Sequence, residues 1–205
     1  GDFHAWCEAA RWLASMHGRL QTEVDRFERE IPLLKYDEDF YRLWMRRAQT
    51  FLTNSAQPDV GNKINWLAER YGRVIENLSS LPKTFLHGEF YASNVLVREA
   101  VKGWRVCPVD WEMAAVGPGL MDLSALAAGK WTEEEKRLMA RAYFESLLPE
   151  GNPFSSKEEF FRAFSLCRLQ IAVQWLGWFG RRRAYSGHAH DWLSEAMSLA
   201  EMLML

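Results

Sequence analysis

The stretch that decides the fold is HGEFYASNVLVREAVKGWRVCPVDWE, residues 87–112. It opens and closes on polar residues, and short apolar runs lie between them at 95–97 and 104–109. Runs of this length, separated by the pair Lys102-Gly103, are typical of two strands joined by a hairpin turn. We therefore expect the polar residues to lie in loops at the ends of adjacent strands.

Both flanks of this stretch have a helical pattern. Apolar side chains recur there at spacings of three and four residues, as on one face of an amphipathic helix. The pattern predicts helices over 2–20, 37–53, 59–79, 119–128, 132–148, 157–182 and 189–204, a connector over 21–36 and a further strand at 84–86. Gly117-Pro118-Gly119 is expected to break the chain between the strands and the later helices.

The predicted fold class is therefore α+β and predominantly helical, with a small β insert near the middle. We expect a single domain over residues 1–205. It would consist of helices over 2–79, a loop with short strands over 83–116, and helices over 119–204.

Charge and cysteine content exclude several classes of protein. The chain has 205 residues, and its 25 Lys and Arg against 27 Asp and Glu give no basic field for nucleic acid or an anionic membrane. Cys7, Cys107 and Cys167 lie far apart without a Cys-x-x-Cys pair, which favours a reduced setting over a disulfide framework or zinc site. No apolar run approaches the ~18 residues of a membrane span. We expect a cytoplasmic protein without nucleic-acid or membrane partners.

Oxygen-bearing side chains gather at the ends of the predicted strands. Asn94 precedes one strand, and Asp110 and Glu112 follow the next. A single carboxylate after a strand is usually a solvated turn residue, but this set offers the oxygen ligands that Mg²⁺ takes together with substrate phosphates. The residues therefore indicate a magnesium and phosphate site.

The order of these residues follows a phosphoryl-transfer pattern, in which a His-x-Asp-x-x-x-x-Asn loop precedes a metal-binding Asp. Here the order is His87-Gly88-Glu89, Asn94, then Val109-Asp110-Trp111-Glu112. With Gly117-Pro118-Gly119 and Asp122-Leu123, it resembles the aminoglycoside phosphotransferase and choline kinase-like family. The resemblance is specific over 87–123 and covers the C-terminal, catalytic lobe of a protein-kinase-like fold.

The resemblance implies an ATP-dependent enzyme that transfers the γ-phosphate to a hydroxyl of a small molecule. Glu89 would stand where the family has its catalytic Asp, and His87 would brace the loop. Asn94 and Asp110 would hold Mg²⁺ on the ATP phosphates, and Glu112 would be a second acidic group at the metal or the substrate.

Other residues receive weaker functional or purely structural interpretations. Asp122 matches an acidic position that the family uses to brace the loop, outside the catalytic set. His17, on the apolar face of the first helix, is interpreted as a hydrogen-bonded core histidine. Most of the ten Trp are expected in the core; Trp175 and Trp178 lie on a helix that such folds place near the acceptor pocket.

The sequence departs from the family pattern in two ways. The extra methylene of Glu89 moves its carboxylate by about 1 Å, and in a site arranged for Asp such a displacement lowers the reaction rate by on the order of 10²-fold. The Glu carboxylate still accepts a proton. The chain also has no Gly-x-Gly-x-x-Gly loop and no Val-Ala-Ile-Lys-like strand. We therefore expect the nucleotide-covering N-terminal lobe to belong to a longer parent protein, and this chain alone to bind ATP poorly and turn over slowly.

Two alternatives remain open. In the first, the chain is a catalytically degenerate kinase-like module that binds without catalysis. In the second, it is a metal-dependent phosphohydrolase built from Glu89, Asn94, Asp110 and Glu112. The acceptor of the kinase reaction is not identified by the sequence.

Overall fold

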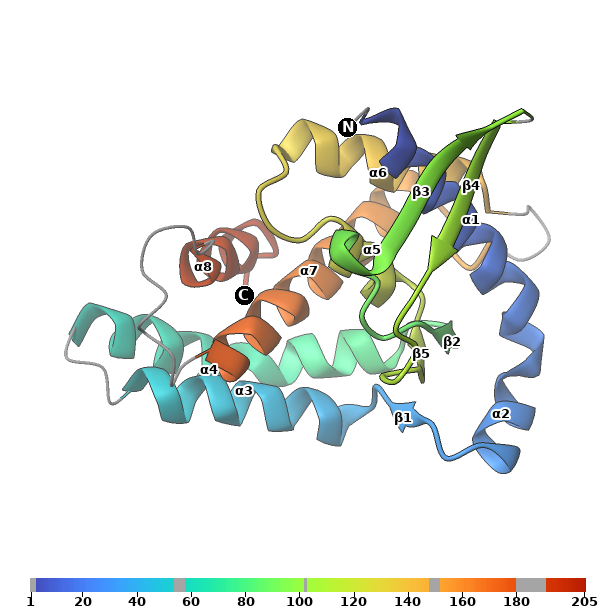
Figure 1. Ribbon diagram of the computed structural model, residues 1–205. Helices are drawn as coiled ribbons and strands as arrows, with labels where there is room; N and C mark the ends of the chain where they lie inside the picture. Colours follow the sequence, from blue (N-terminus) through green and yellow to red (C-terminus); the bar gives the residue numbers. More distant parts are fainter. Residues whose placement is uncertain (1–2, 54–57, 102, 148–151, 180–190) are drawn as a thin grey trace. The chain divides into compact units, whose positions relative to one another are not determined.

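The computed structural model describes residues 3–53, 58–101, 103–147, 152–179 and 191–205 (Figure 1). It is a helix-rich α+β fold, as the sequence predicts. The chain forms two compact units, residues 1–35 with 82–164 and residues 36–81 with 165–205. No helix in the described ranges is long and apolar enough to cross a membrane.

The first unit contains all the described strands. Its elements are α1 (His4–Leu20), η1 (Gln21–Glu23), α2 (Val24–Glu30), β1 (Leu34–Lys35), β2 (Lys83–Leu86), η2 (Ala92–Asn94), β3 (Val95–Ala100), β4 (Gly103–Pro108), β5 (Ala115–Pro118), α5 (Leu120–Leu126), α6 (Glu133–Glu145) and the start of α7 (Lys157–Phe179). The second unit holds α3 (Glu38–Thr53), α4 (Pro58–Ser79), the rest of α7 and α8 (Trp192–Met202).

The strands of the first unit form a small sheet and a separate hairpin. In the sheet, β5 lies between β1, which is parallel to it, and β2, which is antiparallel. The hairpin pairs β3 with β4, with Val95 opposite Pro108 and Ala100 opposite Gly103. The hairpin confirms the interpretation of the central stretch, and its predicted turn residue Lys102 lies outside the described residues.

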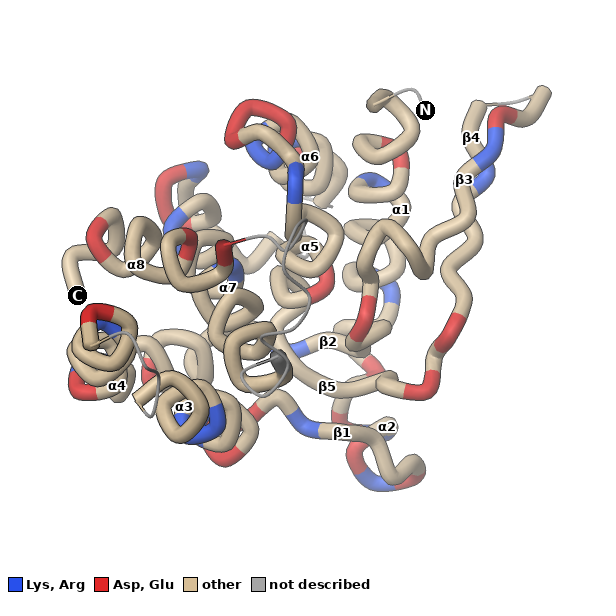
Figure 2. The backbone as a smooth tube through the Cα atoms, turned by 60° about the vertical axis from the view of Figure 1, so that its left-hand side comes forward, with Lys and Arg blue, Asp and Glu red and all other residues tan. Residues whose placement is uncertain are grey.

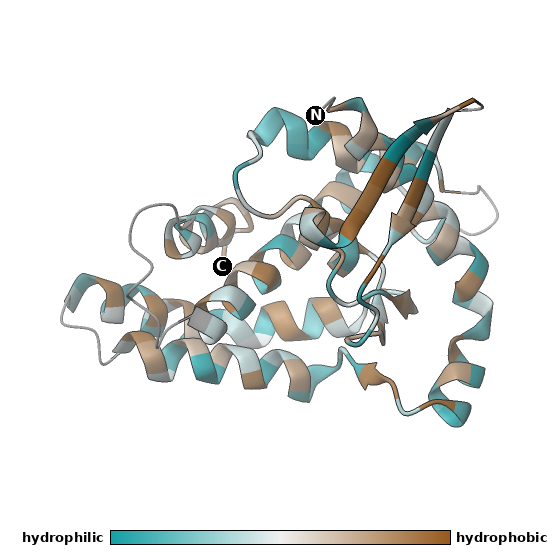
Figure 3. Ribbon diagram, viewed as in Figure 1, coloured by the Kyte–Doolittle hydropathy of each residue, from teal (hydrophilic) through white to brown (hydrophobic). Residues whose placement is uncertain are grey.

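Hydrophobic and charged residues are distributed unevenly over the hairpin and the segment that follows it. Figure 3 shows hydrophobic residues at the base of β3 and hydrophilic ones towards its tip. Figure 2 shows basic and acidic positions interspersed along the tube, with acidic positions in the segment that joins β4 to β5. That segment leads directly from the hairpin into the central strand of the sheet, so its acidic residues lie where the two β structures meet.

Two predictions about local structure were wrong. Residues 21–36 contain η1, α2 and β1 rather than a plain connector, and β5 covers Gly117 and Pro118, which were expected to break the chain. These elements are short, and β1 acquires its strand geometry by pairing with Ala115 and Val116, which are remote in the sequence. The local sequence pattern therefore does not predict these short elements.

The ends of the predicted helices agree within a few residues. Thr132 caps α6 through a reciprocal capping box with Glu135, so the helix begins at Glu133. The predicted ends at residue 2, at 148, at 180–182 and at 189–190 lie outside the described residues.

Each unit has its own apolar core. In the first unit α1 buries Ala9, Ala10, Leu13 and Ala14, and the small side chains of the three alanines let the helix pack closely against α6 and β2. In the second unit α3 packs on α4, and the buried Tyr71 hydroxyl donates to Gln170 Oε1 at 2.8 Å.

Candidate active site

Gly88 places the loop after β2 against the segment after β4. It has φ +85°, and a Cβ at this position would overlap the carbonyl oxygen of Met113. Only glycine combines this left-handed conformation with so close a backbone approach. The contact brings Glu89 towards the stretch that carries Asp110 and Glu112.

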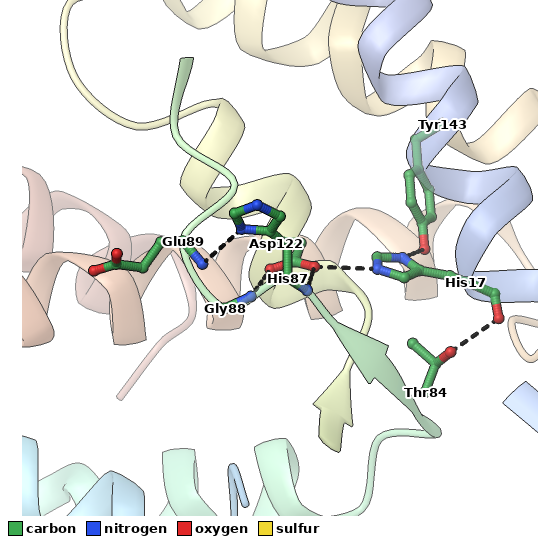
Figure 4. Close-up of polar contacts among 7 residues, drawn as sticks. All are labelled: His17, Thr84, His87, Gly88, Glu89, Asp122 and Tyr143. Carbon is green, nitrogen blue, oxygen red and sulfur yellow. Dashed lines mark hydrogen bonds and ion pairs between the residues drawn. The ribbon is translucent and has the colours of Figure 1, made fainter. Parts of the chain in front are cut away.

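Asp122, in the first turn of α5, fixes the same loop through hydrogen bonds to its backbone. Its carboxylate is 1% exposed and accepts hydrogen bonds from the backbone N–H of His87 at 2.7 Å and of Gly88 at 2.9 Å (Figure 4). Charge-assisted bonds of this kind are about twice as strong as neutral ones. The position matches the bracing role expected for Asp122.

The ring of His87 links the loop to the end of the hairpin. It is fully buried; Nδ1 accepts from the backbone N–H of Glu89 at 3.3 Å, and Nε2 lies 3.0 Å from the carbonyl oxygen of Val109. Because a carbonyl oxygen only accepts, the hydrogen-bond network assigns the ring hydrogen to Nε2. His87 therefore holds the residue before Asp110 against the loop.

Three carboxylates converge beside this loop. Oxygen atoms of Glu89, Asp110 and Glu112 lie within 4.8 Å of one another, with Glu89 half-buried and the other two exposed. Burial raises the pKa of Glu89, Asp110 and Glu112 raise it further, and His87 opposes the rise. The three residues form an acidic cluster in which the negative charges repel one another.

Asp110 has an uncommon backbone conformation. Its φ is +66°, in the left-handed region that non-glycine residues rarely adopt. The preceding residue is fixed, because the Val109 N–H donates to the Asn94 carbonyl at 2.9 Å. Such conformations persist where surrounding structure holds them, and they are frequent at functional sites.

Asn94 lies at the end of the loop. Its Nδ2 donates to the backbone oxygen of Glu89 at 3.0 Å, and Ser93 Oγ donates to its Oδ1 at 3.4 Å. With the amide nitrogen engaged by the loop, Oδ1 is the atom that Asn94 offers to a cation.

The acidic cluster suits a divalent cation. Its members supply hard oxygen donors, which Mg²⁺ prefers, and their mutual repulsion is relieved when positive charge is bound between them. Sequence reasoning separated Glu89 as a catalytic residue from Asn94, Asp110 and Glu112 as metal ligands. The structure brings the carboxylate of Glu89 into the same group as those of Asp110 and Glu112.

The sequence predicts only part of a buried polar network that lies behind the loop. His17 is a hydrogen-bonded core histidine, as interpreted from the sequence, and its partners are Asp122 and Tyr143. Tyr143 is 126 residues from His17 in the sequence, and no local pattern singles it out. The close approach of Gly88 to Met113 was also missed, although a glycine next to a candidate site residue was a usable signal.

The two tryptophans considered for an acceptor pocket lie in the second unit. Trp175 stacks on Trp192 with ring centroids 5.4 Å apart, and Trp178, 59% exposed, lies 5.8 Å from the Trp44 ring. Trp178 therefore offers an aromatic surface to solvent.

Comparison with known proteins gives a family and a fold. The model of the phosphotransferase enzyme family matches residues 2–157, whereas no curated protein matches. Similar solved structures include the choline kinase LicA from Streptococcus pneumoniae (15% identity, TM-score 0.54, 98% of this chain and 64% of that one). A choline/ethanolamine kinase family protein from Mesorhizobium loti has 16% identity and a TM-score of 0.58 over 97% of this chain and 60% of that one.

A third similar structure is a mutant of aminoglycoside 2'-phosphotransferase IIIa in complex with GDP, with 16% identity and a TM-score of 0.64. The match covers 98% of this chain and 62% of that one. The chain thus spans less than two thirds of each of these three relatives, and identities this low establish the fold alone. Because the family model covers more than half of the chain, this protein belongs to the phosphotransferase enzyme family.

Proposed function

We propose that the chain is the catalytic lobe of a small-molecule kinase, which transfers the γ-phosphate of ATP to a hydroxyl group with the help of Mg²⁺. The observation that carries the proposal is the acidic cluster, in which Glu89, on the loop that Asp122 fixes, lies with Asp110 and Glu112 of the segment after β4, all three within 4.8 Å of one another. Similar structures are named choline kinase and aminoglycoside phosphotransferase, and relatives have been solved with AMP and with GDP. These names support a nucleotide and a small alcohol as the substrates.

The residues of the site have distinct proposed roles. Asp110 and Glu112, with Asn94 Oδ1, would hold the cation, which when bound offsets the negative charge of the phosphates. Glu89 would orient the acceptor hydroxyl and take its proton. Its pKa is raised by burial and by the neighbouring carboxylates, which makes it a stronger proton acceptor than an ordinary Glu.

The nucleotide also needs an apolar surface and a covering element. Leu96 on β3 is 60% exposed and lies two residues beyond Asn94, so β3 offers an apolar side chain close in the sequence to the proposed cation ligand. The 205 residues contain neither a Gly-x-Gly-x-x-Gly loop nor a Val-Ala-Ile-Lys-like strand. We therefore assign the cover over the phosphates to an N-terminal lobe of the parent protein, and we expect the chain alone to be nearly inactive.

The test is transfer of labelled γ-phosphate by the natural full-length protein to a panel of alcohols, including choline, ethanolamine and aminoglycosides. Asp110→Asn is the informative variant, because Asn tolerates the positive φ of Asp110 but lacks the charge. We expect it to lower transfer by at least about 10²-fold with an unchanged unfolding midpoint. Phosphate release that needs no acceptor and no nucleotide would instead favour the phosphohydrolase alternative.

A second candidate function is a kinase-like module that binds without catalysis. It is favoured by Glu89, which stands where the family pattern has Asp. Binding of ATP by the full-length protein, with no transfer to any acceptor in the panel, would support this function over the enzyme.

A further inference from the structure

A groove lies between α3 and α4 of the second unit, two helices that run side by side (Figure 1). Its volume is about 250 Å³. Each helix lines it with side chains at positions i, i+3, i+4 and i+7, which share one face of a helix. On α3 these positions run from Arg42 to Gln49, and on α4 they run from Ala68 to Ile75. Two facing stripes of side chains therefore form the walls of the groove.

The floor of the groove is apolar. Met45, Tyr71 and Ile75 line it, and all three side chains are buried. The hydroxyl of Tyr71 donates to Oε1 of Gln170 on α7 at 2.8 Å. Because the polar end of Tyr71 is engaged by α7, these three side chains present mainly hydrocarbon to a ligand in the groove.

Gly72 keeps the groove open. It lies inside α4, where glycine is less favourable than alanine, and a Cβ at this position would meet nothing within 4 Å. No close approach of a neighbouring element therefore requires glycine here. Because Gly72 lines the groove, any larger residue at position 72 would place its side chain in space that is now available to a ligand.

The α3 side of the groove is basic. Arg42 and Arg46 lie one helical turn apart, a spacing at which like charges repel each other. Arg42 pairs with Glu38 at 3.0 Å, but both side chains are exposed, and surface pairs of this kind contribute little. Arg46 has no ion pair among the described residues, and none of the described side chains that line the groove is acidic. Positive charge thus gathers at one wall of the groove, in a chain whose formal net charge is −2.

We propose that this groove binds a small aliphatic carboxylate. Arg42 and Arg46 hold the carboxylate, because guanidinium groups donate paired hydrogen bonds that match its geometry. The hydrocarbon chain lies on the apolar floor and passes over Gly72. Charge and hydrocarbon are both needed, since water competes for an ion at exposed arginines and the apolar floor is small. This site goes beyond the proposed kinase function and does not depend on it.

Octanoate is the probe, and two further compounds separate its parts. Octanol keeps the hydrocarbon chain without the charge, and acetate keeps the charge without the chain. Calorimetric titration of this chain should show saturable binding of octanoate, with an affinity at least about ten-fold higher than for either of the other two compounds.

Matched variants locate the binding site. Arg46→Gln should weaken octanoate binding by on the order of ten-fold. Arg73→Gln removes the same charge from an exposed position of α4 outside the groove, and it should leave the affinity unchanged. Gly72→Leu fills the groove and should abolish binding. Its control is Gly18→Leu in α1, where a Cβ also meets nothing within 4 Å, and binding should persist.

Methionine methyl groups give a readout that needs no variant. The NMR signal of the Met45 methyl should shift as octanoate is added and should saturate together with the calorimetric curve. The methyl of Met121, which is buried in the first unit, should keep its chemical shift. These signals and Arg46→Gln decide the question even if Gly72→Leu does not fold.

Several results would overturn the inference. Absence of saturable octanoate binding by the folded wild-type protein would refute the site, and equal affinities for octanol and octanoate would show that the arginines do not hold a carboxylate. Unchanged affinity in folded Gly72→Leu, equal losses in Arg46→Gln and Arg73→Gln, or an unshifted Met45 signal would each place octanoate elsewhere on the protein.

Discussion

Glu89 is the residue whose side-chain length matters most for the proposed chemistry. Its backbone N–H is bonded to His87, and its carboxylate points away from that ring (Figure 4) and lies with Asp110 and Glu112. The loop thus presents the longer Glu side chain directly to the acidic cluster. We infer that the site is adapted to Glu rather than weakened by it.

Glu89→Asp tests this adaptation. Shortening the side chain withdraws the carboxylate by about 1 Å, so we expect kcat for transfer by the full-length protein to fall by on the order of 10²-fold. Folding should be unaffected, because the side chain contributes little to the core. A rise in kcat would show instead that Glu is a handicap at this position.

The raised pKa of Glu89 also gives the protein a pH dependence of stability. The folded state holds the Glu89 proton more tightly than the unfolded state, so the unfolded state releases it at lower pH. Stability from this group is therefore present below the ordinary Glu pKa and is lost as pH rises through the raised one. Glu89→Gln should remove this loss, and the variant should gain stability relative to wild type as pH rises from below the ordinary Glu pKa towards neutral.

Urea unfolding across that pH range is the measurement. Divalent cations are left out, because bound cation would offset the repulsion between the carboxylates. Parallel curves for wild type and Glu89→Gln would mean that neither burial nor the carboxylates of Asp110 and Glu112 raise the pKa of Glu89 in the folded protein.

At the scale of the secondary-structure element, the conformation of the loop between β2 and η2 depends on one glycine, Gly88. Gly88 and Gly129 both have positive φ, +85° and +93°, but a Cβ on Gly129 meets nothing within 4 Å, whereas one on Gly88 overlaps the Met113 carbonyl. Gly129→Ala therefore reports the conformational cost alone, about 1 kcal/mol. Gly88→Ala adds the overlap and should destabilise the protein by at least about 1 kcal/mol more.

Urea unfolding of the two glycine variants provides the comparison. Equal losses in the free energy of unfolding would mean that the approach of Gly88 to Met113 is not a tight contact in solution.

The same loop shows how far sequence reasoning reaches. The hairpin and the positions of Glu89, Asp110 and Glu112 near strand ends could be predicted, because short apolar runs and turn residues are local signals. The parallel pairing of Leu34 and Lys35 with β5 could not, because a two-residue strand has no pattern of its own. The convergence of the three carboxylates required the backbone contact at Gly88, which only the folded chain brings about.

At the scale of the whole molecule, the family and the fold are established, and the assignment of a metal-dependent site rests on the acidic cluster. The loop is fixed from three sides in the first unit, by Asp122, by His87 and by the Met113 carbonyl. Such preorganisation is what phosphoryl transfer demands, because catalysis there is mostly positioning and charge stabilisation. The central claim is that this preorganised cluster binds a divalent cation.

Calorimetric titration of this chain with Mn²⁺, for the wild-type protein and for Asp110→Asn, tests that claim most directly. We predict saturable binding by the wild-type protein and an affinity weakened at least about ten-fold in Asp110→Asn, with the same unfolding midpoint for both proteins. Absence of binding by the folded wild-type protein, or equal affinity in the two proteins, would contradict the account.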